Sequence, residues 1–169
     1  IGSPYDDDAG SGSGSAYVLR TSDGGATYVE VAKLTAADAA AEDLFGFSVA
    51  IDGNTVVVGA RYDDDAGSMS GSAYVFRTTD GGATYDQVAK LTAADAAAED
   101  QFGVSVAIDG DTIVIGAYKD NSGRGSVYVF RTTDGGATYG QVAKLTASDA
   151  AEDDWFGGSV AIDGNTVVV

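Results

Sequence analysis

Apolar and polar residues alternate with a period of two over several short stretches, which is the pattern of half-buried β-strands. "SVAID" (48–52) alternates in this way, whereas "TVVVGA" (55–60) is continuously apolar and predicts a strand buried on both faces. "SAYVFRT" (72–78) alternates again, and "YDQVAKLT" (85–92) does so more weakly. Asp-Gly pairs between the stretches indicate tight turns. The pattern therefore predicts four short antiparallel strands.

This set of strands recurs along the chain. Equivalent phenylalanines lie 57 and then 54 residues apart, at Phe45, Phe102 and Phe156. The third copy is shorter because "DDDAGSMSGS" (63–72) is reduced to "DNSGRGS" (120–126). Four strands in about 57 residues predict one blade of a β-propeller. A parallel β-helix, the competing architecture, repeats at about 20–30 residues and is not favoured.

The two ends of the sequence share one phase of the repeat. Residues 1–6 align with 58–63, and Val169 also aligns with Val58. We therefore expect residues 1–169 to form about three blades that are incomplete at both ends, with blade phases starting near the three phenylalanines. The alternative is a unit that joins head to tail with copies of itself.

The alanine-rich stretch "TAADAAAED" (92–100) leaves two interpretations open. A short helix would begin with Thr92 as its cap and Asp95 three residues later, as in a capping box. An irregular connection between blades is the other interpretation.

Two short motifs add a resemblance to a known family. Phe-Gly pairs at 45–46, 102–103 and 156–157 are followed about a dozen residues later by Gly-Ala, or by Gly2-Ser3-Pro4 in the first copy. This arrangement resembles the FG-GAP repeat, the blade motif of the integrin α-subunit propeller and of many extracellular proteins. The resemblance implies a propeller of about seven blades, to which this chain would contribute about three. We expect the Phe to pack between blades and the Gly to allow a close backbone approach.

The resemblance also implies calcium in the loop after the Gly-Ala motif. Calcium binds about 6–8 oxygen ligands, mostly carboxylate and carbonyl. The acidic runs of the three loops supply the predicted ligands: Asp6, Asp7, Asp8, Asp63, Asp64, Asp65, Asp120 and Asn121.

The loops depart from the family pattern. Gly67 stands where the family has a further Asp, and the shorter third loop carries Arg124, whose charge could replace a cation. The alternative to a metal site is a solvated acidic loop that bonds to its own backbone.

Composition narrows the classes of partner and chemistry. The formal net charge of −17 disfavours nucleic acid and anionic membranes as partners. The chain has no His and no Cys, so Ser/His/Asp and Cys/His catalytic sets are excluded. No apolar run approaches the roughly 20 residues that a membrane-spanning helix needs.

Most charged residues recur at fixed positions of the repeat, which is typical of scaffold. We expect the basic ones to form ion pairs between strands or blades, the acids before each Phe-Gly to bond amides of the next blade's turn, and the Asp-Gly-Gly acids to shape turns. The basic residues are Arg20, Arg77, Arg131, Lys33, Lys90 and Lys144; the acidic ones are 42–43, 99–100 and 152–154, with Asp23, Asp80 and Asp134 in the turns.

The sequence thus predicts an all-β, non-catalytic propeller module, extracellular or on the cell surface, with a structural or adhesive role and calcium as its expected ion. Its expected partners are proteins, including further blades or neighbouring subunits, or carbohydrate. Two alternatives remain: an accessory propeller of a secreted enzyme, and a self-assembling repeat unit.

Overall fold

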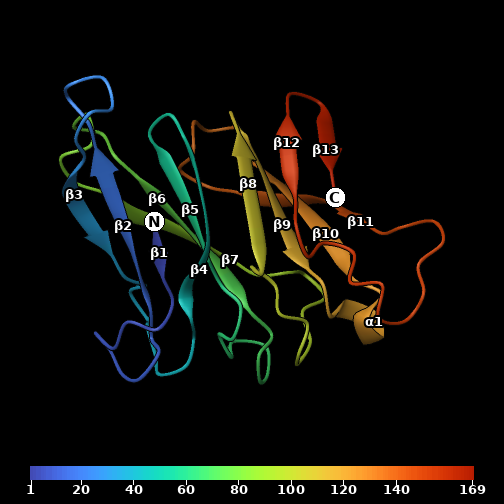
Figure 1. Ribbon diagram of the computed structural model, residues 1–169. Helices are drawn as coiled ribbons and strands as arrows, with labels where there is room; N and C mark the ends of the chain where they lie inside the picture. Colours follow the sequence, from blue (N-terminus) through green and yellow to red (C-terminus); the bar gives the residue numbers. More distant parts are fainter.

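The computed structural model describes residues 1–169 and consists of four β-sheets that stand side by side (Figure 1). Two sheets are complete four-stranded antiparallel blades, with strand orders β4-β5-β6-β7 and β8-β9-β10-β11. A three-stranded sheet, β1-β2-β3, precedes them, and the hairpin β12-β13 follows. We call these the first to fourth blades in chain order. The predicted all-β fold of repeated blades is confirmed.

The strands occupy the stretches that the alternation predicts. Their bounds are β1 Gly2–Ser3, β2 Ser15–Arg20, β3 Val29–Leu34, β4 Phe45–Asp52, β5 Thr55–Ala60, β6 Ser72–Arg77, β7 Asp86–Leu91, β8 Ser105–Asp109, β9 Thr112–Ala117, β10 Ser126–Arg131, β11 Gly140–Leu145, β12 Ala161–Asp163 and β13 Thr166–Val168. All six residues of β5 are buried, as its continuous apolar run predicts.

The core lies between blades. Phe45, from the start of the second blade, is fully buried and packs against Ala16 and Leu34 of the first blade. Its ring also meets Tyr74 and Phe76 edge-on, with centroids 5.4 and 5.9 Å apart. Phe102 repeats this packing between the second and third blades. The predicted wedge role of the phenylalanine is therefore confirmed.

The position after each of these phenylalanines requires glycine for two reasons: its φ is positive, and the backbone of the neighbouring blade leaves no room for a Cβ. Gly46 has a φ of 90°, in the left-handed region, and a Cβ there would overlap the carbonyl oxygen of Ser15 in the first blade. The carbonyl oxygen of Gly103, the next copy, rests on Gly59 and accepts a hydrogen bond from the Ser48 hydroxyl at 2.7 Å. The Phe-Gly motif of one blade thus sits directly on the Gly-Ala motif of the preceding blade.

The connector 92–100 forms turns, so the helical interpretation is wrong and the irregular one is confirmed. Its amides bond to side chains instead of to helical carbonyls: Ala94 donates to the Gln141 side chain at 2.9 Å, and Ala97 donates to the Asp100 side chain at 2.8 Å. The one helical segment, α1 (Asp120–Gly123), is four residues long. No helix in the structure is long and apolar enough to cross a membrane.

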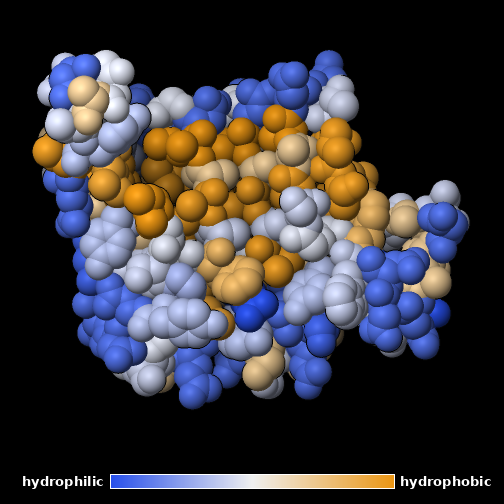
Figure 2. Space-filling view, in the orientation of Figure 1, coloured by the Kyte–Doolittle hydropathy of each residue, from blue (hydrophilic) through white to orange (hydrophobic).

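The connections gather at two opposite edges of the molecule (Figure 1). The loops after β1, β5 and β9 and the connectors between blades lie at the lower edge, which we call the loop edge (residues 4–14, 35–44, 61–71, 92–104, 118–125 and 146–160). The Asp-Gly hairpins and Asp-Gly-Gly turns lie at the opposite edge, the turn edge. Figure 2 shows an apolar band across the strands and a mostly polar loop edge below it.

Candidate functional site

The acidic loop of the second blade is organised around Asp63, which is only 4% exposed. Its Oδ2 accepts a hydrogen bond from the Tyr74 hydroxyl at 2.6 Å, and its Oδ1 accepts one from the Ser72 hydroxyl at 3.1 Å. The amide of Asp65 donates to the same Oδ1 at 3.2 Å. A buried carboxylate requires such donors, because they replace the hydrogen bonds to water that it loses on burial.

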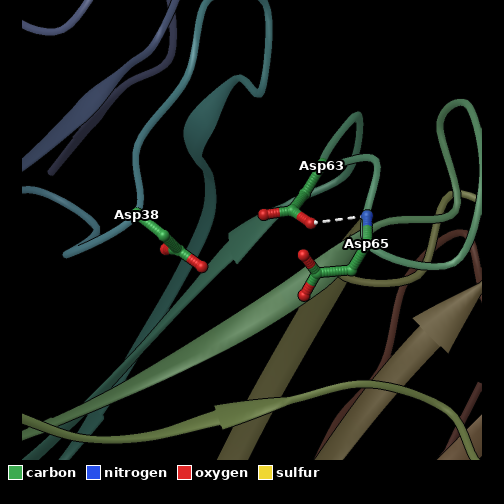
Figure 3. A group of neighbouring side chains, drawn as sticks. All are labelled: Asp38, Asp63 and Asp65. Carbon is green, nitrogen blue, oxygen red and sulfur yellow. Dashed lines mark hydrogen bonds between the residues drawn. The ribbon is translucent and has the colours of Figure 1, made fainter.

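Lys90, on β7, brings its ammonium group to the same place. Its Nζ lies 3.0 Å from Asp63, 2.5 Å from Asp65 and 2.7 Å from Asp38. Asp38 comes from the connector that enters the second blade, and Figure 3 shows its carboxylate facing those of Asp63 and Asp65 across a shared gap. The Nζ also lies 5.2 Å from the centre of the Tyr74 ring. We call Asp38, Asp63, Asp65 and Lys90 the lysine cluster of the second blade.

The pKa shifts follow from this geometry. Burial by itself would lower the pKa of Lys90, but its bonds to Asp38, Asp65 and Asp63 outweigh burial and raise the pKa above its ordinary value of 10.5. Burial would likewise raise the pKa of Asp38, but the bond from Lys90 prevails and lowers it. The lysine is therefore fully charged at neutral pH.

The first blade holds the same arrangement. Asp6 accepts hydrogen bonds from the Ser15 and Tyr17 hydroxyls, both at 2.8 Å. The Nζ of Lys33 lies 3.0 Å from Asp6 and also pairs with Asp8.

The third blade holds a reduced version. Lys144 lies 2.6 Å from Asp120 and 2.7 Å from Asp95 of the connector. The Ser126 hydroxyl donates to Asp120 at 2.5 Å, whereas the Tyr128 hydroxyl is 3.5 Å away from it. The prediction that the three recurrent lysines form ion pairs is confirmed.

The predicted loop residues divide into two groups. The first and third acids of each run face a lysine, namely Asp6, Asp8, Asp63, Asp65 and, in the short loop, Asp120. The middle position turns away to bond its own loop: Asp7 accepts from the Gly12 amide at 2.8 Å and Asp64 accepts from the Met69 amide at 2.7 Å. Asn121, at φ 52°, only offers its carbonyl to Arg124.

Arg124 does not take the place of a cation beside Asp120. It lies 3.7 Å from Glu152 and 3.3 Å from the Asn121 carbonyl, and Lys144 fills the position next to Asp120. The connector acids Asp38 and Asp95 were missing from the predicted set. Their recurrence in both "TAAD" stretches was the available signal, but the sequence analysis considered Asp95 only as the second member of a possible capping box.

Two further expectations need correction. The guanidinium groups of Arg20 and Arg77 donate to the Gly81 and Gly135 carbonyls in the next blade's turn, so they bridge blades without forming ion pairs. The acids before Phe-Gly bond their own connector: Asp43, for example, accepts from Ala40 at 2.7 Å, three residues before it. The turn of the connector brings the amide three residues earlier within hydrogen-bond reach of the side chain, and the same bond recurs at Asp100 and Asp154.

The turn acids behave as predicted. Asp80 accepts hydrogen bonds from the Thr78 hydroxyl at 2.8 Å, from the Thr84 hydroxyl at 2.7 Å and from two amides of its own turn. These bonds, led by the Thr84 amide, lower its pKa below the ordinary value of 3.8.

The lysine cluster fits an ammonium ion better than a calcium ion. The three carboxylates offer oxygens within 4.8 Å of one another, which a bound cation could bridge. The Lys90 ammonium, however, already contacts all three, and both oxygens of Asp63 already accept hydrogen bonds. Calcium in these loops therefore stays a prediction.

A second feature of the loop edge is its non-repeating surface between blades. At the junction of the first and second blades, a pocket of about 340 Å³ is lined by Tyr5, Leu44, Arg61 and Tyr62, among others. The Arg61 guanidinium lies 3.8 Å from the centre of the Phe47 ring and 4.5 Å from that of Tyr62.

The first pocket also contains two acids, Asp7 and Glu42, whereas the corresponding pocket of the third blade contains four acids and no aromatic residue. It is lined by Glu99, Asp100, Glu152 and Asp153, with Lys119 as its one basic residue. The same place in the repeat thus carries different chemistry in different blades.

Comparison with models of protein families gives a match. The FG-GAP repeat family matches three segments, residues 28–76, 85–130 and 139–169, which together make up most of the chain. No curated protein matches the chain significantly. FG-GAP repeats are generally non-catalytic repeat modules and typically occur in extracellular proteins. With three matched copies, sheets that form successive blades, and Phe-Gly seated on Gly-Ala between blades, the chain belongs to the FG-GAP repeat family.

Proposed function

We propose that this chain is part of a non-catalytic extracellular interaction module that binds a protein partner through its loop edge. The observation that carries the proposal is the division of labour between repeating and non-repeating residues. The repeating side chains stabilise the fold. Phe45 packs between two blades, the ion pair of Lys90 with Asp63 stabilises a loop, and Arg77 donates a hydrogen bond to the turn of the next blade.

The side chains that differ between repeats concentrate at the loop edge. Equivalent positions hold Pro4, Arg61 and Tyr118, and the adjacent positions hold Tyr5, Tyr62 and Lys119. A scaffold residue tends to recur in every blade, whereas a binding residue serves one partner at one place. The variation therefore favours recognition as the role of this edge.

The chemistry of the first junction favours a protein partner. Tyr5 is 74% exposed, and Arg61 is held between two aromatic rings beside it. Tyr and Arg are enriched among residues that dominate protein–protein binding, because they combine large apolar area with hydrogen-bonding groups. The stacked arginine is already ordered, so binding would cost little additional side-chain entropy.

The test compares three proteins on an array of extracellular proteins and on a glycan array. They are the wild type, a loop-edge variant carrying Tyr5→Ser and Arg61→Ser, and a control carrying Tyr28→Ser. Tyr28 is 60% exposed and lies at the turn edge. We expect the loop-edge variant to lose at least about tenfold in affinity for a protein that the wild type and the control both retain.

Three results would count against the proposal. If the three proteins bound the arrayed partner with equal affinity, the loop edge would not be the binding surface. Hits confined to the glycan array would replace the protein partner with carbohydrate. Chemical turnover of a bound component would contradict a non-catalytic role.

A further inference from the structure

The lysine cluster of the second blade contains its own positive charge. We propose that the Lys90 ammonium is the permanent cation of this cluster, that the loop therefore needs no divalent ion, and that removal of the ammonium turns the cluster into a calcium site. This inference stands apart from the proposed partner binding, because it concerns what holds the acidic loop in shape.

The Lys90 nitrogen occupies the position that a bound ion would need. Oxygens of Asp38, Asp63 and Asp65 lie within 4.8 Å of one another, and Nζ lies 2.5–3.0 Å from each carboxylate. An ion that bridged the three carboxylates would occupy this same volume. A divalent ion and an ammonium group cannot share it, since they would repel each other at contact distance.

The Lys90 side chain is held in place by the surrounding structure. Lys90 lies on β7, and its side chain is only 19% exposed. Its Nζ lies 5.2 Å from the centre of the Tyr74 ring. A calcium ion would have to expel a tethered charge whose local concentration is always high. The displaced ammonium would also lose its three carboxylates.

The cluster has few free oxygen ligands to offer an added ion. Calcium needs about 6–8 of them. The Tyr74 and Ser72 hydroxyls and the Asp65 amide direct their hydrogens at the two oxygens of Asp63. Those lone pairs are already engaged, so few ligands remain for an added ion while Lys90 is present.

The arrangement recurs with the repeat. Lys33 pairs with Asp6 and Asp8, and Lys144 pairs with Asp95 and Asp120. An internal cation at the same strand position in three blades is a structural rule of this chain. Its consequence is a module whose blades keep their shape at any calcium concentration.

The first experiment uses the wild-type chain with calcium alone as the probe. Thermal unfolding is followed in a chelator and in millimolar CaCl2, with ionic strength matched by NaCl, and calcium titration calorimetry is run on the folded protein. We expect the same midpoint temperature in both buffers and no binding heat. A calcium-dependent rise in the wild-type midpoint, or saturable binding heat, would overturn the proposal.

The second experiment removes the ammonium. Lys90→Met is expected to unfold at a lower temperature than wild type in chelator and to recover several degrees in CaCl2, because a ligand that binds only the folded state stabilises it. Lys90→Gln, which keeps much of the stem, is the second variant in case the first does not fold. Adding Asp63→Asn to either variant should abolish the calcium response.

Two matched variants test the specificity of this gain. Lys119→Met removes the same charge from the loop edge but breaks no ion pair, so it should show no calcium response. Lys144→Met exposes two carboxylates instead of three and should bind calcium at least about tenfold more weakly than Lys90→Met. A response of Lys119→Met equal to that of Lys90→Met, or none in any Lys90 variant, would refute the conversion to a calcium site.

Discussion

The second and third blades are built alike, but their acidic loops differ by three residues. Both keep an inner Asp, a Ser, a Tyr and a Lys in the same relation: Asp63, Ser72, Tyr74 and Lys90 in the second blade, and Asp120, Ser126, Tyr128 and Lys144 in the third. Both also receive an Asp from the preceding connector. Of these two blades, the second alone has an outer acid, Asp65, beside its lysine.

The difference separates what the cluster needs from what it tolerates. Loss of three residues removes the outer acid and places Asn121 and Ser122 in left-handed conformations, yet the lysine and the inner Asp stay in contact. The shorter loop also moves the Tyr hydroxyl from 2.6 Å to 3.5 Å from the inner carboxylate. The inner Asp with its lysine is thus the invariant part, and the outer acid is dispensable.

The largest expected effect follows from removing the inner Asp. Asp63→Ala leaves the Lys90 ammonium and two hydroxyls without their central acceptor, so we expect a loss of about 3 kcal/mol in the free energy of unfolding. Asp120→Ala should lose somewhat less, about 2 kcal/mol, because its Tyr hydrogen bond is already long. Urea unfolding measures both.

Asp64→Ala is the matched control for this pair. Asp64 is exposed and accepts a single amide hydrogen bond, from Met69, so its loss should stay below about 1 kcal/mol. If Asp64→Ala destabilised the chain as much as Asp63→Ala, the distinction between inner and middle acids would be void.

This distinction also marks how far the sequence could be interpreted. Strands and blades were predictable because alternation and Asp-Gly turns act locally, and the second blade follows them closely. The lysine pairing was predictable in kind from its recurrence. The partner Asp38 was not, since it lies 52 residues from Lys90 and only the stacking of blades brings them together.

The helical interpretation of residues 92–100 was wrong for the same reason, namely contacts between residues far apart in the sequence. The alanines of 92–100 favour a helix by local propensity. Tertiary partners outweigh this preference, because the Gln141 side chain in the third blade takes the Ala94 amide. The sequence also could not predict that Asp7 and Asp64 bond to amides of their own loops and not to a lysine. Adjacent acids of one run look equivalent in the sequence, and only the folded loop distinguishes them.

The next largest expected effect is that low pH reduces the contribution of the lysine cluster of the second blade to the free energy of unfolding. Burial alone would raise the pKa of Asp38, but Lys90 lowers it below the ordinary 3.8. A group with a lowered folded pKa contributes stability above its unfolded value and loses it as the pH falls through the folded value. The stability gap between wild type and Lys90→Met should therefore be largest at neutral pH and narrow below about pH 4.

Two buried acids act in the opposite direction. Burial raises the pKa of Asp43 and Asp100, so their contribution is fully present below 3.8 and is lost as the pH rises through their folded pKa. Wild type and Lys90→Met both retain Asp100, and Lys90 is not among the groups that shift its pKa, so its contribution cancels in the difference. Lys90 opposes the rise in the Asp43 pKa, so its removal raises that pKa further and also widens the gap at neutral pH. Urea unfolding from pH 7 to pH 3 gives the gap directly; a gap independent of pH would contradict the ion-pair account.

A smaller effect is expected from the Tyr hydroxyls. Tyr74→Phe removes a 2.6 Å hydrogen bond to a buried carboxylate, and we expect a loss of about 1 to 1.5 kcal/mol. Tyr128→Phe removes a contact of 3.5 Å, so its loss should be below about 0.5 kcal/mol. Because both substitutions keep the ring in its core, thermal or urea unfolding reports mainly the hydroxyl. Equal losses would show that the two loops hold their carboxylates equally well.

The smallest expected effect belongs to the outer acid, and it tests whether the third blade is a complete version of the cluster. Asp65→Ser removes one partner of Lys90 but leaves Asp63 and Asp38, and the Asp65 side chain is 48% exposed, so solvent screens its charge. We expect a loss of at most about 0.5 kcal/mol, which disappears in concentrated NaCl. The Asp65 amide, which serves Asp63, is unaffected by the substitution. A loss close to that of Asp63→Ala would mean that the longer loop acts as one unit, and that the third blade has replaced the outer acid by some other contact.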